Sequence, residues 1–282
     1  MALPPDFGVN EFVQRVLAED LGKGGDVTSN ATIDADARFS AEMNCRQAIV
    51  VAGLELAAAF FRALDPGVTV ELLVNDGDRA EHGSTIMRLA GKARAMLTAE
   101  RSALNTLQHL SGIATLTRTY VDEIAGTGAV VIDTRKTLPG LRVLEKYAVR
   151  MGGGQNHRMR LDDGLLIKDN HVAVCGGVAE AVRRAKDANT GLQVQVEVDR
   201  LDQIEPALAA GADRLLLDNM DPTKLREAVK MVAGRVPLEA SGGVTLETIR
   251  FLAETGVDFI SLGRITQSAP SVDIGLDYAL SR

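Results

Sequence analysis

Residues 129–136, AVVIDTRK, and residues 164–171, GLLIKDNH, share one pattern, in which a short apolar run is followed at once by charged and polar residues. Further apolar runs follow at 193–198, 214–218, 236–240 and 258–262. Such runs are typical of parallel strands that are buried on both faces. We therefore predict a parallel sheet whose functional side chains gather at the carboxyl ends of its strands.

Segments with apolar residues at helical spacing separate these runs. They lie at 178–185, 201–208, 225–232 and 246–252, and Gly191, Gly211, Gly234 and Gly256 follow them as helix caps. Alternating strands and helices predict right-handed crossovers and an α/β fold. The alternation by itself is compatible with a nearly closed barrel and with an open sheet.

The first part of the chain follows another pattern. A helix is expected from about Asn10, and strands are expected at 39–44, 48–52, 68–74 and 85–89, with a helix at 54–64 among them. A long helical stretch then covers about 95–125. We predict a small α+β domain over 1–110 and an α/β catalytic domain over 111–269, with the tail 270–282 as a segment that could return to the first domain.

Composition excludes several classes of protein. The net charge is −7, aromatic residues make up 4% and tryptophan is absent, which argues against nucleic acid as a partner. Two cysteines, Cys45 and Cys175, form neither a disulfide framework nor a metal-binding pair. No apolar stretch is long enough to cross a bilayer and the first residues lack a signal-peptide pattern, so we expect no membrane association and a cytoplasmic location.

Cations nevertheless gather in one part of this acidic chain. Between 133 and 171 stand Arg135, Lys136, His157, Arg158, Lys168 and His171. Each follows an apolar run or lies in the glycine-rich segment 152–158. Because the overall composition does not demand positive charge, this concentration indicates a local anion site.

Two acidic residues, Glu197 and Asp218, end successive apolar runs. Mg²⁺ prefers oxygen ligands and needs only one or two carboxylates beside substrate oxygens, so these residues could hold it. They could instead bind hydroxyl groups of a ligand directly. Ser241-Gly242-Gly243 and Gly263 follow the last two runs, where the loops of β/α barrels often bind phosphate through backbone N–H groups.

The motifs DTRK (133–136), GGGQNHR (152–158) and LIKDNH (166–171) resemble, in order and spacing, those of the quinolinate phosphoribosyltransferases. The resemblance extends over the whole chain, through GDVTS (25–29), ERSALN (100–105), LSGIAT (110–115), EVD (197–199), LLDN (216–219) and EASGG (239–243). It implies an incomplete, six-strand α/β barrel. It also implies phosphoribosyl transfer from phosphoribosyl pyrophosphate to quinolinate with decarboxylation, which gives nicotinate mononucleotide, pyrophosphate and CO₂ in NAD biosynthesis.

Both substrates are polyanions, and arginine forks match carboxylates in bidentate geometry. The resemblance assigns quinolinate to Arg101, Thr134, Arg135, Lys136, His157, Arg158 and Lys168. It assigns phosphoribosyl pyrophosphate to Lys136, Glu197, Asp218, Ser241, Gly242, Gly243 and Gly263. We expect Lys136, Lys168, Glu197 and Asp218 to carry catalysis, with Mg²⁺ held by Glu197 and Asp218 partly through water or substrate.

Arg101 lies outside the barrel repeats. The resemblance implies that it completes the quinolinate pocket of the neighbouring subunit in a homodimer, on which a higher oligomer could be built. Arg264 and Gln267 depart from the family pattern, in which a small residue and often a histidine are expected, so the details of phosphate contact there are open.

Two other functions remain compatible with these residues. Lys168 at a strand end could form a Schiff base in a barrel lyase. A homologous accessory protein could also keep the fold and the anion site without catalysing the reaction.

Overall fold

The computed structural model describes residues 3–4 and 7–278, so residues 279–282 of the expected returning tail lie outside the described part. The chain forms two compact units. The first comprises the residues up to 116, the segment 143–153 and the residues from 268 on, and the second comprises 117–142 and 154–267. Helix α4 (Ala93–Glu123) runs from the first unit into the second.

The first unit is built on an antiparallel four-stranded sheet. Its strands are, in order, β12 (Ile274–Tyr278), β1 (Arg38–Cys45), β5 (Thr85–Lys92) and β3 (Thr69–Leu72). In β1 the side chains of Ala41, Met43 and Cys45 are buried and those between them are less so, the alternation expected of a sheet with one face toward a core. The remaining elements are α1 (Val9–Leu21), α2 (Val27–Thr32), α3 (Leu54–Leu64) and a ribbon of β2 (Ile49–Val50) and β4 (Arg79–Ala80).

The second unit contains six parallel strands. They are β6 (Val130–Ile132), β7 (Leu165–Ile167), β8 (Val194–Val198), β9 (Arg214–Asp218), β10 (Leu238–Ser241) and β11 (Phe259–Ser261). Around the sheet they stand in the order β6-β11-β10-β9-β8-β7. The last strand thus pairs with the first, and the first and second strands are not neighbours in the sheet. The predicted class, an incomplete six-strand α/β barrel with a small α+β domain, is confirmed.

The glycine-rich segment lies at the open edge beside β6. Gln155 forms a parallel bridge with Ile132, its N–H donates to the carbonyl of Val131, and its carbonyl accepts from the N–H of Asp133. A single residue therefore extends the sheet past β6. It is followed directly by His157 and Arg158, so the gap in the barrel is where this part of the predicted site is attached.

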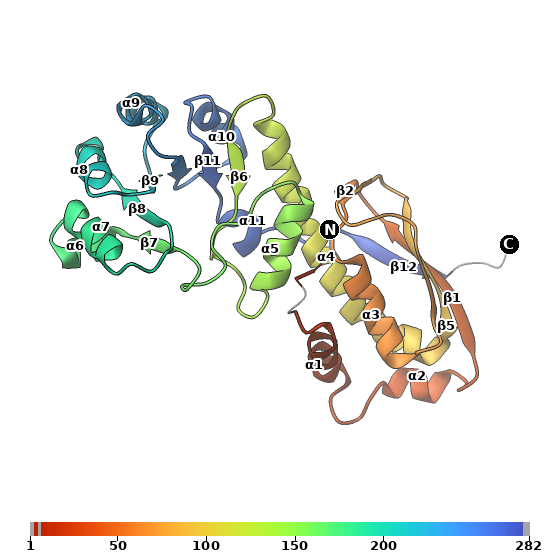
Figure 1. Ribbon diagram of the computed structural model, residues 1–282. Coiled ribbons are helices and arrows are strands. Elements are labelled where there is room, and N and C mark those ends of the chain that lie inside the picture. Colours follow the sequence, from red (N-terminus) through yellow and green to blue (C-terminus); the bar gives the residue numbers. More distant parts are fainter. Residues whose placement is uncertain (1–2, 5–6, 279–282) are drawn as a thin grey trace. The chain divides into compact units, whose positions relative to one another are not determined.

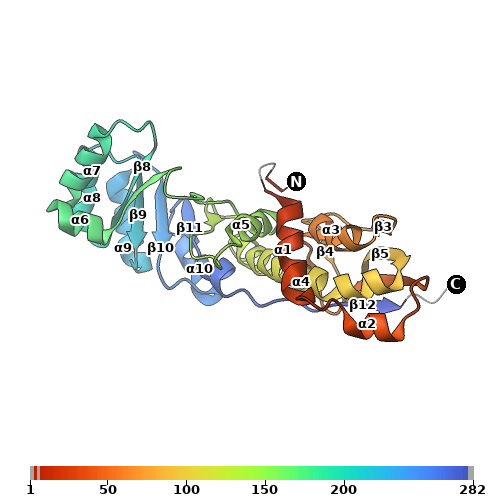
Figure 2. The ribbon, with the colours of Figure 1, turned by 90° about the horizontal axis from the view of Figure 1, so that it is seen from below.

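Helices cover the outside of the parallel sheet, as Figures 1 and 2 show. They are α7 (Val178–Asp187), α8 (Ile204–Ala209), α9 (Pro222–Val232) and α10 (Leu246–Ala253), with the short helices α6 (Asp169–Cys175) and α11 (Arg264–Gln267) at strand ends. Among the described residues no helix is long and apolar enough to cross a membrane.

Helix α5 (Arg142–Met151) was not predicted. Its buried side includes Glu145 and Lys146, both fully buried, and Glu145 lies 3.0 Å from the ring Nε2 of His109. Charged residues on the buried side hide the apolar periodicity by which a helix is recognised. From Val143 on, this helix belongs to the first unit, although the strands before and after it belong to the second.

Candidate active site

The carboxyl ends of the parallel strands bring most of the predicted site together. Thr134, Arg135 and Lys136 follow β6, Lys168 follows β7, Glu197 lies in β8, Asp218 ends β9, Ser241 ends β10 ahead of Gly242 and Gly243, and Gly263 follows β11. Since parallel strands end at the same edge of a sheet, these residues share one face of the second unit. Arg101 is exposed on α4 in the first unit.

The loop that carries His157 and Arg158 is tied to the end of β6. The buried carboxylate of Asp133 accepts the backbone N–H of His157 at 2.8 Å and the side-chain amide of Asn156 at 2.6 Å. Asp133 is the first residue of the DTRK motif, and the sequence predicted no role for it. It links the loop to the residues that immediately precede Arg135.

Arg135 and Arg158 form a pair of like charges. Burial lowers the pKa of the Arg158 guanidinium, the charge of Arg135 lowers it further, and Asp163 acts in the opposite direction. The Arg158 side chain donates to the carbonyl of Gly164 at 2.8 Å. Within the part of the chain that the structure describes, the buried Nε of Arg135 has no hydrogen-bond partner. Two guanidinium groups whose charges act on one another, one of them with an unpartnered Nε, are suited to a ligand with two carboxylates.

Glu197 and Asp218 form a pair of the opposite sign. Burial raises the pKa of Glu197, and the charges of Asp218 and Asp169 raise it further. The pKa of Asp218 is also raised, chiefly by burial, against the lowering effect of its hydrogen bond from Asn219 and of the charge of Lys136. Each carboxylate therefore lies where negative charge is costly without a cation.

Two lysines complete the mouth of the barrel. The charge of Lys168 counteracts the raised pKa of Glu197, and that of Lys136 does the same for Asp218. The Lys136 side chain also passes close to Gly263, where an added Cβ would come within 2.7 Å of its Cδ. Lys136 thus extends from the end of β6 to Gly263 at the end of β11. Its charge also acts on the Asp218 carboxylate.

The loop after β10 depends on its glycines. Gly242 has a φ of 99°, and a Cβ added there would lie 2.1 Å from the side-chain oxygen of Asn219. Asn219 itself has a φ of 53°, donates to the Asp218 carboxylate at 2.6 Å, and binds the Ser241 carbonyl through its N–H at 2.9 Å. The Asn219 side chain, which follows β9, therefore packs against the backbone of Gly242, which follows β10. This contact leaves no room for a larger residue at 242.

The donors available to a metal ion are limited. In the described ranges no group of three or more histidine, cysteine or acidic side chains could hold a metal. Glu197 and Asp218, with their raised pKa values, are two hard oxygen donors on adjacent strands. This set fits Mg²⁺, which takes few protein ligands and fills its shell with substrate oxygens and water.

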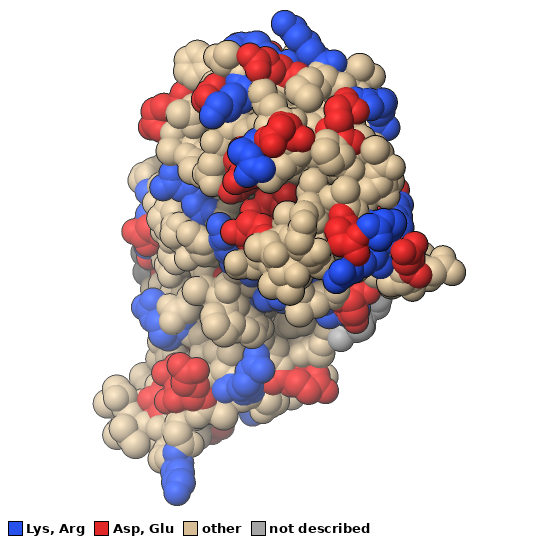
Figure 3. Space-filling model, turned by 90° about the vertical axis from the view of Figure 1, so that its left-hand side faces the viewer, with Lys and Arg blue, Asp and Glu red and all other residues tan. Residues whose placement is uncertain are grey.

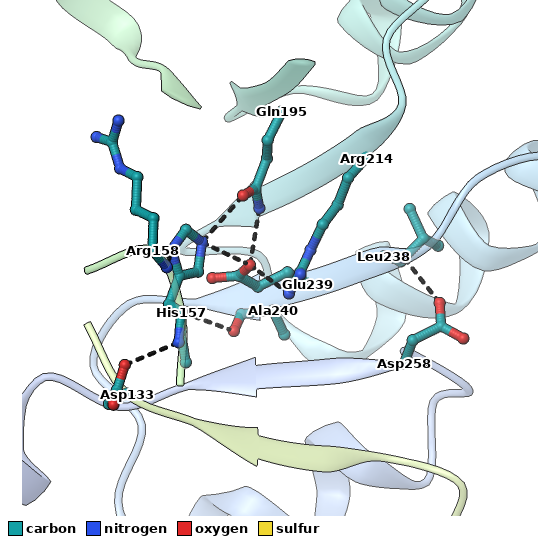
Figure 4. A network of polar contacts seen from close by, with 10 residues as sticks. Asp133, His157, Arg158, Gln195, Arg214, Leu238, Glu239, Ala240 and Asp258 are labelled. Carbon is teal, nitrogen blue, oxygen red and sulfur yellow. Dashed lines mark hydrogen bonds and ion pairs between the residues drawn. The ribbon is translucent and has the colours of Figure 1, made fainter. Parts of the chain in front are cut away.

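A network of buried polar side chains lies below the mouth of the barrel (Figure 4). The sequence predicted His157 as a site residue but did not predict its contacts in this network. The His157 Nε2 lies 2.9 Å from the Oε1 of Gln195, whose amide donates to Glu239 at 2.7 Å, and Arg214 forms an ion pair with the same Glu239 oxygen at 2.7 Å. Polar residues at alternate positions of otherwise apolar strands were the available signal. Alternation along a strand shows which residues share a face, but it does not show which residues of other strands they contact.

Charges of both signs lie on the surface of the molecule. On the face shown in Figure 3, basic and acidic side chains are interspersed and form no broad field of one sign. This distribution agrees with the net charge of −7.

The chain is similar to known proteins over nearly its whole length. Two family models match the chain, the N-terminal domain of quinolinate phosphoribosyl transferase over 26–111 and its C-terminal domain over 113–277. The nicotinate-nucleotide pyrophosphorylase (carboxylating) of Mycobacterium leprae is 44% identical over 272 residues, which cover 95% of this chain and 96% of that one. The probable enzyme of the same name from Bacillus subtilis is 42% identical over 97% of this chain and 94% of its own. The crystal structure of nicotinate-nucleotide pyrophosphorylase from Ehrlichia chaffeensis is similar with a TM-score of 0.93 at 40% identity, covering 97% of this chain and 100% of that one.

Proposed function

The chain belongs to the quinolinate phosphoribosyltransferase family, and we propose that it transfers the phosphoribosyl group of phosphoribosyl pyrophosphate to quinolinate, with decarboxylation. The products are nicotinate mononucleotide, pyrophosphate and CO₂, a step of NAD biosynthesis. The observation that carries this conclusion is similarity over nearly the full length of the relatives. The position of Arg135, Lys168, Glu197 and Asp218 at or just after the ends of barrel strands supports it.

Quinolinate is assigned to the basic side of the mouth. Arg135 and Arg158 would each bind one of its two carboxylates, because a guanidinium matches a carboxylate with two parallel hydrogen bonds. Thr134, Lys136, His157 and Lys168 complete this pocket. The spare Nε of Arg135 and the repulsion between the two arginines support the assignment, since both are relieved by a dianion.

Phosphoribosyl pyrophosphate is assigned to the acidic side and the glycine loops. Ser241, Gly242, Gly243 and Gly263 would offer backbone N–H groups to phosphate, and Lys136 would contact pyrophosphate. Glu197 and Asp218 would hold Mg²⁺ or the ribose hydroxyls. When bound there, Mg²⁺ would offset the negative charge that develops on the departing pyrophosphate.

The reaction needs positioning and charge stabilisation more than covalent catalysis. The bond between ribose C1 and the pyrophosphate oxygen breaks as the pyridine nitrogen forms its bond to C1, and Lys136 stabilises the leaving group. The C2 carboxylate then leaves as CO₂. Its bonding electron pair stays on C2 beside the positively charged ring nitrogen, and C2 takes up a proton. Lys168 and Lys136 tune the charge around the ring during this step.

Two further features are part of the proposal. We place the enzyme in the cytoplasm. We also propose that it acts as a homodimer, or as a higher oligomer built from it, in which Arg101 reaches the quinolinate pocket of the neighbouring subunit. Family membership argues against a Schiff-base lyase that uses Lys168. In addition, Schiff-base chemistry does not need the other cations that surround this lysine.

The direct test is an assay of nicotinate mononucleotide formation. With phosphoribosyl pyrophosphate and Mg²⁺ we expect turnover of quinolinate and none of nicotinate. Nicotinate would leave one cation of the closed ligand complex without its carboxylate, which costs roughly 2 to 5 kcal/mol. Equal turnover of the two acids would contradict the pocket assignment, and absence of turnover with quinolinate would contradict the proposed function.

A further inference from the structure

The interior of the parallel sheet contains a polar layer directly below the mouth. Gln195 lies two residues before Glu197, Glu239 two before Ser241, and Arg214 four before Asp218. Because successive side chains of a strand point to opposite faces, each of these residues faces the same side as the site residue at the end of its strand. Branched apolar residues usually fill this place in β/α barrels. A charged layer here is costly to bury, so its presence calls for a reason.

Glu239 is the centre of this layer. Its side chain is 1% exposed, and Gln195 is 6% exposed. A guanidinium nitrogen of Arg214 lies 2.7 Å from the Glu239 carboxylate. The guanidinium carbon of Arg214 lies over the ring of Phe259, 3.9 Å from its centroid. Burial raises the pKa of Glu239, but the hydrogen bond from His157 and the charge of Arg214 outweigh it and hold the pKa below the ordinary value. Glu239 is therefore ionised and can only accept hydrogen bonds.

An ionised Glu239 determines the orientation of its neighbours. Gln195 must turn its NH₂ toward Glu239, where the distance is 2.7 Å, and this leaves its oxygen for His157. His157 must then carry its proton on Nε2, which lies 2.9 Å from that oxygen and 3.5 Å from the Glu239 carboxylate itself. Its Nδ1 is left as an acceptor, and it takes the backbone N–H of Arg158 at 2.7 Å. Each step follows from which group can donate and which can accept.

The outer end of this chain of bonds is the loop of the quinolinate site. The N–H of His157 is held by Asp133 and the N–H of Arg158 by the His157 ring, so two successive amides are tied to side chains. In Figure 4 the His157 ring points inward to Gln195 and Glu239, whereas the Arg158 side chain points away from them. The charge of Arg135 acts against that of Arg158, and these two bonds restrain the backbone from which the Arg158 side chain extends.

We propose that Glu239, acting with Gln195 and Arg214, is a positioning group for quinolinate recognition: it selects the Nε2-protonated tautomer of His157, and His157 in turn fixes the backbone of Arg158. The proposal rests on the proposed function for its ligand. It gives His157 a role through Arg158, with both ring nitrogens engaged by the protein. None of the three interior residues needs to touch substrate.

The main test is Glu239→Gln, which keeps the shape and removes the charge. A glutamine at 239 can offer either an oxygen or an NH₂ to Gln195, so the direction of the hydrogen bonds is lost. We expect the affinity for quinolinate to fall roughly tenfold to a hundredfold, as for a displaced binding group, while that for phosphoribosyl pyrophosphate changes less than about twofold. Calorimetry with each ligand alone measures both. Glu205→Gln, which removes an exposed partner of Arg235, is the matched control and should change neither.

A second measurement needs no substrate. Nitrogen NMR of the histidine rings should show His157 protonated on Nε2 alone in the unsubstituted chain and in a mixture of forms in Glu239→Gln. The chain has four histidines, and His157→Gln identifies the signal. An unchanged tautomer, or equal loss of both ligands with an intact fold, would overturn the proposal. The NMR measurement requires no turnover. It therefore tests the role of Glu239 even if the enzyme does not catalyse the proposed reaction.

A packing-preserving variant covers the case in which Glu239→Gln does not fold. Arg214→Met with Glu239→Met replaces the buried ion pair by apolar side chains of similar length, an exchange that proteins often tolerate. We expect the double variant to fold, to lose the single tautomer of His157 and to bind quinolinate as weakly as Glu239→Gln. Quinolinate binding as tight as in the unsubstituted chain would overturn the proposal.

Discussion

At the scale of single residues, the candidate site is defined by two pairs of like charges. Arg135 and Arg158 repel one another, and so do Glu197 and Asp218. Close like charges are unfavourable in the free protein and become favourable when a ligand of opposite charge binds between them. This pattern favours an anionic group of the ligand beside Arg135 and Arg158, and a cation beside Glu197 and Asp218.

Arg158→Ala should separate these two regions. We expect it to weaken quinolinate binding by at least about tenfold, because a carboxylate loses its charge-assisted bonds, and to change phosphoribosyl pyrophosphate binding much less. Glu197→Ala should show the reverse and alter the Mg²⁺ dependence. Calorimetry on each ligand separately is the measurement. Loss of both ligands to the same extent in both variants would show that the division is wrong.

The raised pKa of Glu197 also predicts an effect on stability. The folded chain binds a proton on Glu197 more tightly than the unfolded chain does, so the ionised group destabilises the fold above its folded pKa. The penalty disappears as the pH falls through that value to the ordinary one. Glu197→Gln should therefore raise Tm at about pH 7, by about 1 to 3 °C, and have no effect below about pH 4. Thermal melts at the two pH values check this.

Glu205→Gln serves as the control for that melt. Hydrogen bonds and the charge of Arg235 lower the pKa of Glu205, which is the opposite shift, so its neutralisation should not raise Tm. A lower Tm for Glu197→Gln than for the unsubstituted chain at about pH 7 would contradict the assignment of Glu197 to a site of unfavourable charge.

At the scale of elements, strand ends and the turns after them hold the site in place. The open edge beside β6 is extended by Gln155, and the β9 and β10 ends are joined through Asn219 and the Ser241 carbonyl. These contacts leave little freedom in the loops. A substitution that disturbs a turn should therefore be felt in ligand binding even where the substituted residue has no side chain of its own.

Gly242→Ala and Gly243→Ala form a matched pair for this idea. Both positions have positive φ, 99° and 59°, but only a Cβ at 242 meets the Asn219 side chain, at 2.1 Å. Gly243→Ala should cost about 1 to 2 kcal/mol through its backbone conformation alone. Gly242→Ala should cost more and should break the Asn219–Asp218 hydrogen bond.

The two variants are compared by thermal denaturation and by the affinity for phosphoribosyl pyrophosphate. We expect Gly242→Ala to be the worse in both. Equal effects would mean that the contact with Asn219 has no importance for the loop.

At the scale of the whole molecule, the two units carry different parts of the predicted site. Every cation assigned to quinolinate except Arg101 belongs to the second unit, and Arg101 is exposed on α4 in the first. In a symmetric dimer, a contact between Arg101 and the neighbouring subunit would occur twice. The oligomer is therefore where the role of Arg101 can be tested.

Mixed dimers of Arg101→Ala and Lys168→Ala provide that test. Each homodimer should be nearly inactive. In a heterodimer one composite site receives both intact residues, so up to half of the normal activity should return. Co-expression with separate tags, isolation of the heterodimer and an activity assay measure it. Activity no higher than that of the parents would mean that Arg101 acts within its own chain or is an exposed surface residue.

The sequence by itself determined the second unit well. Short apolar runs with polar ends predicted all six parallel strands, because a strand buried on both faces has a continuous apolar signal and its end marks the functional edge. The same runs located Arg135, Lys168, Glu197 and Asp218 at strand ends. The closure of the sheet followed from the family resemblance, since local periodicity carries no information on which strands are neighbours.

Only the tertiary structure decided the contacts between residues far apart in the chain. Helix α5 escaped prediction because its buried side is charged, and the link from Arg214 through Glu239 and Gln195 to His157 joins three strands and a loop. A polar residue inside a strand has the same local pattern whether it is solvated or paired. Which of the two holds depends on the partner that folding brings beside it, and that partner is set by strand order and register.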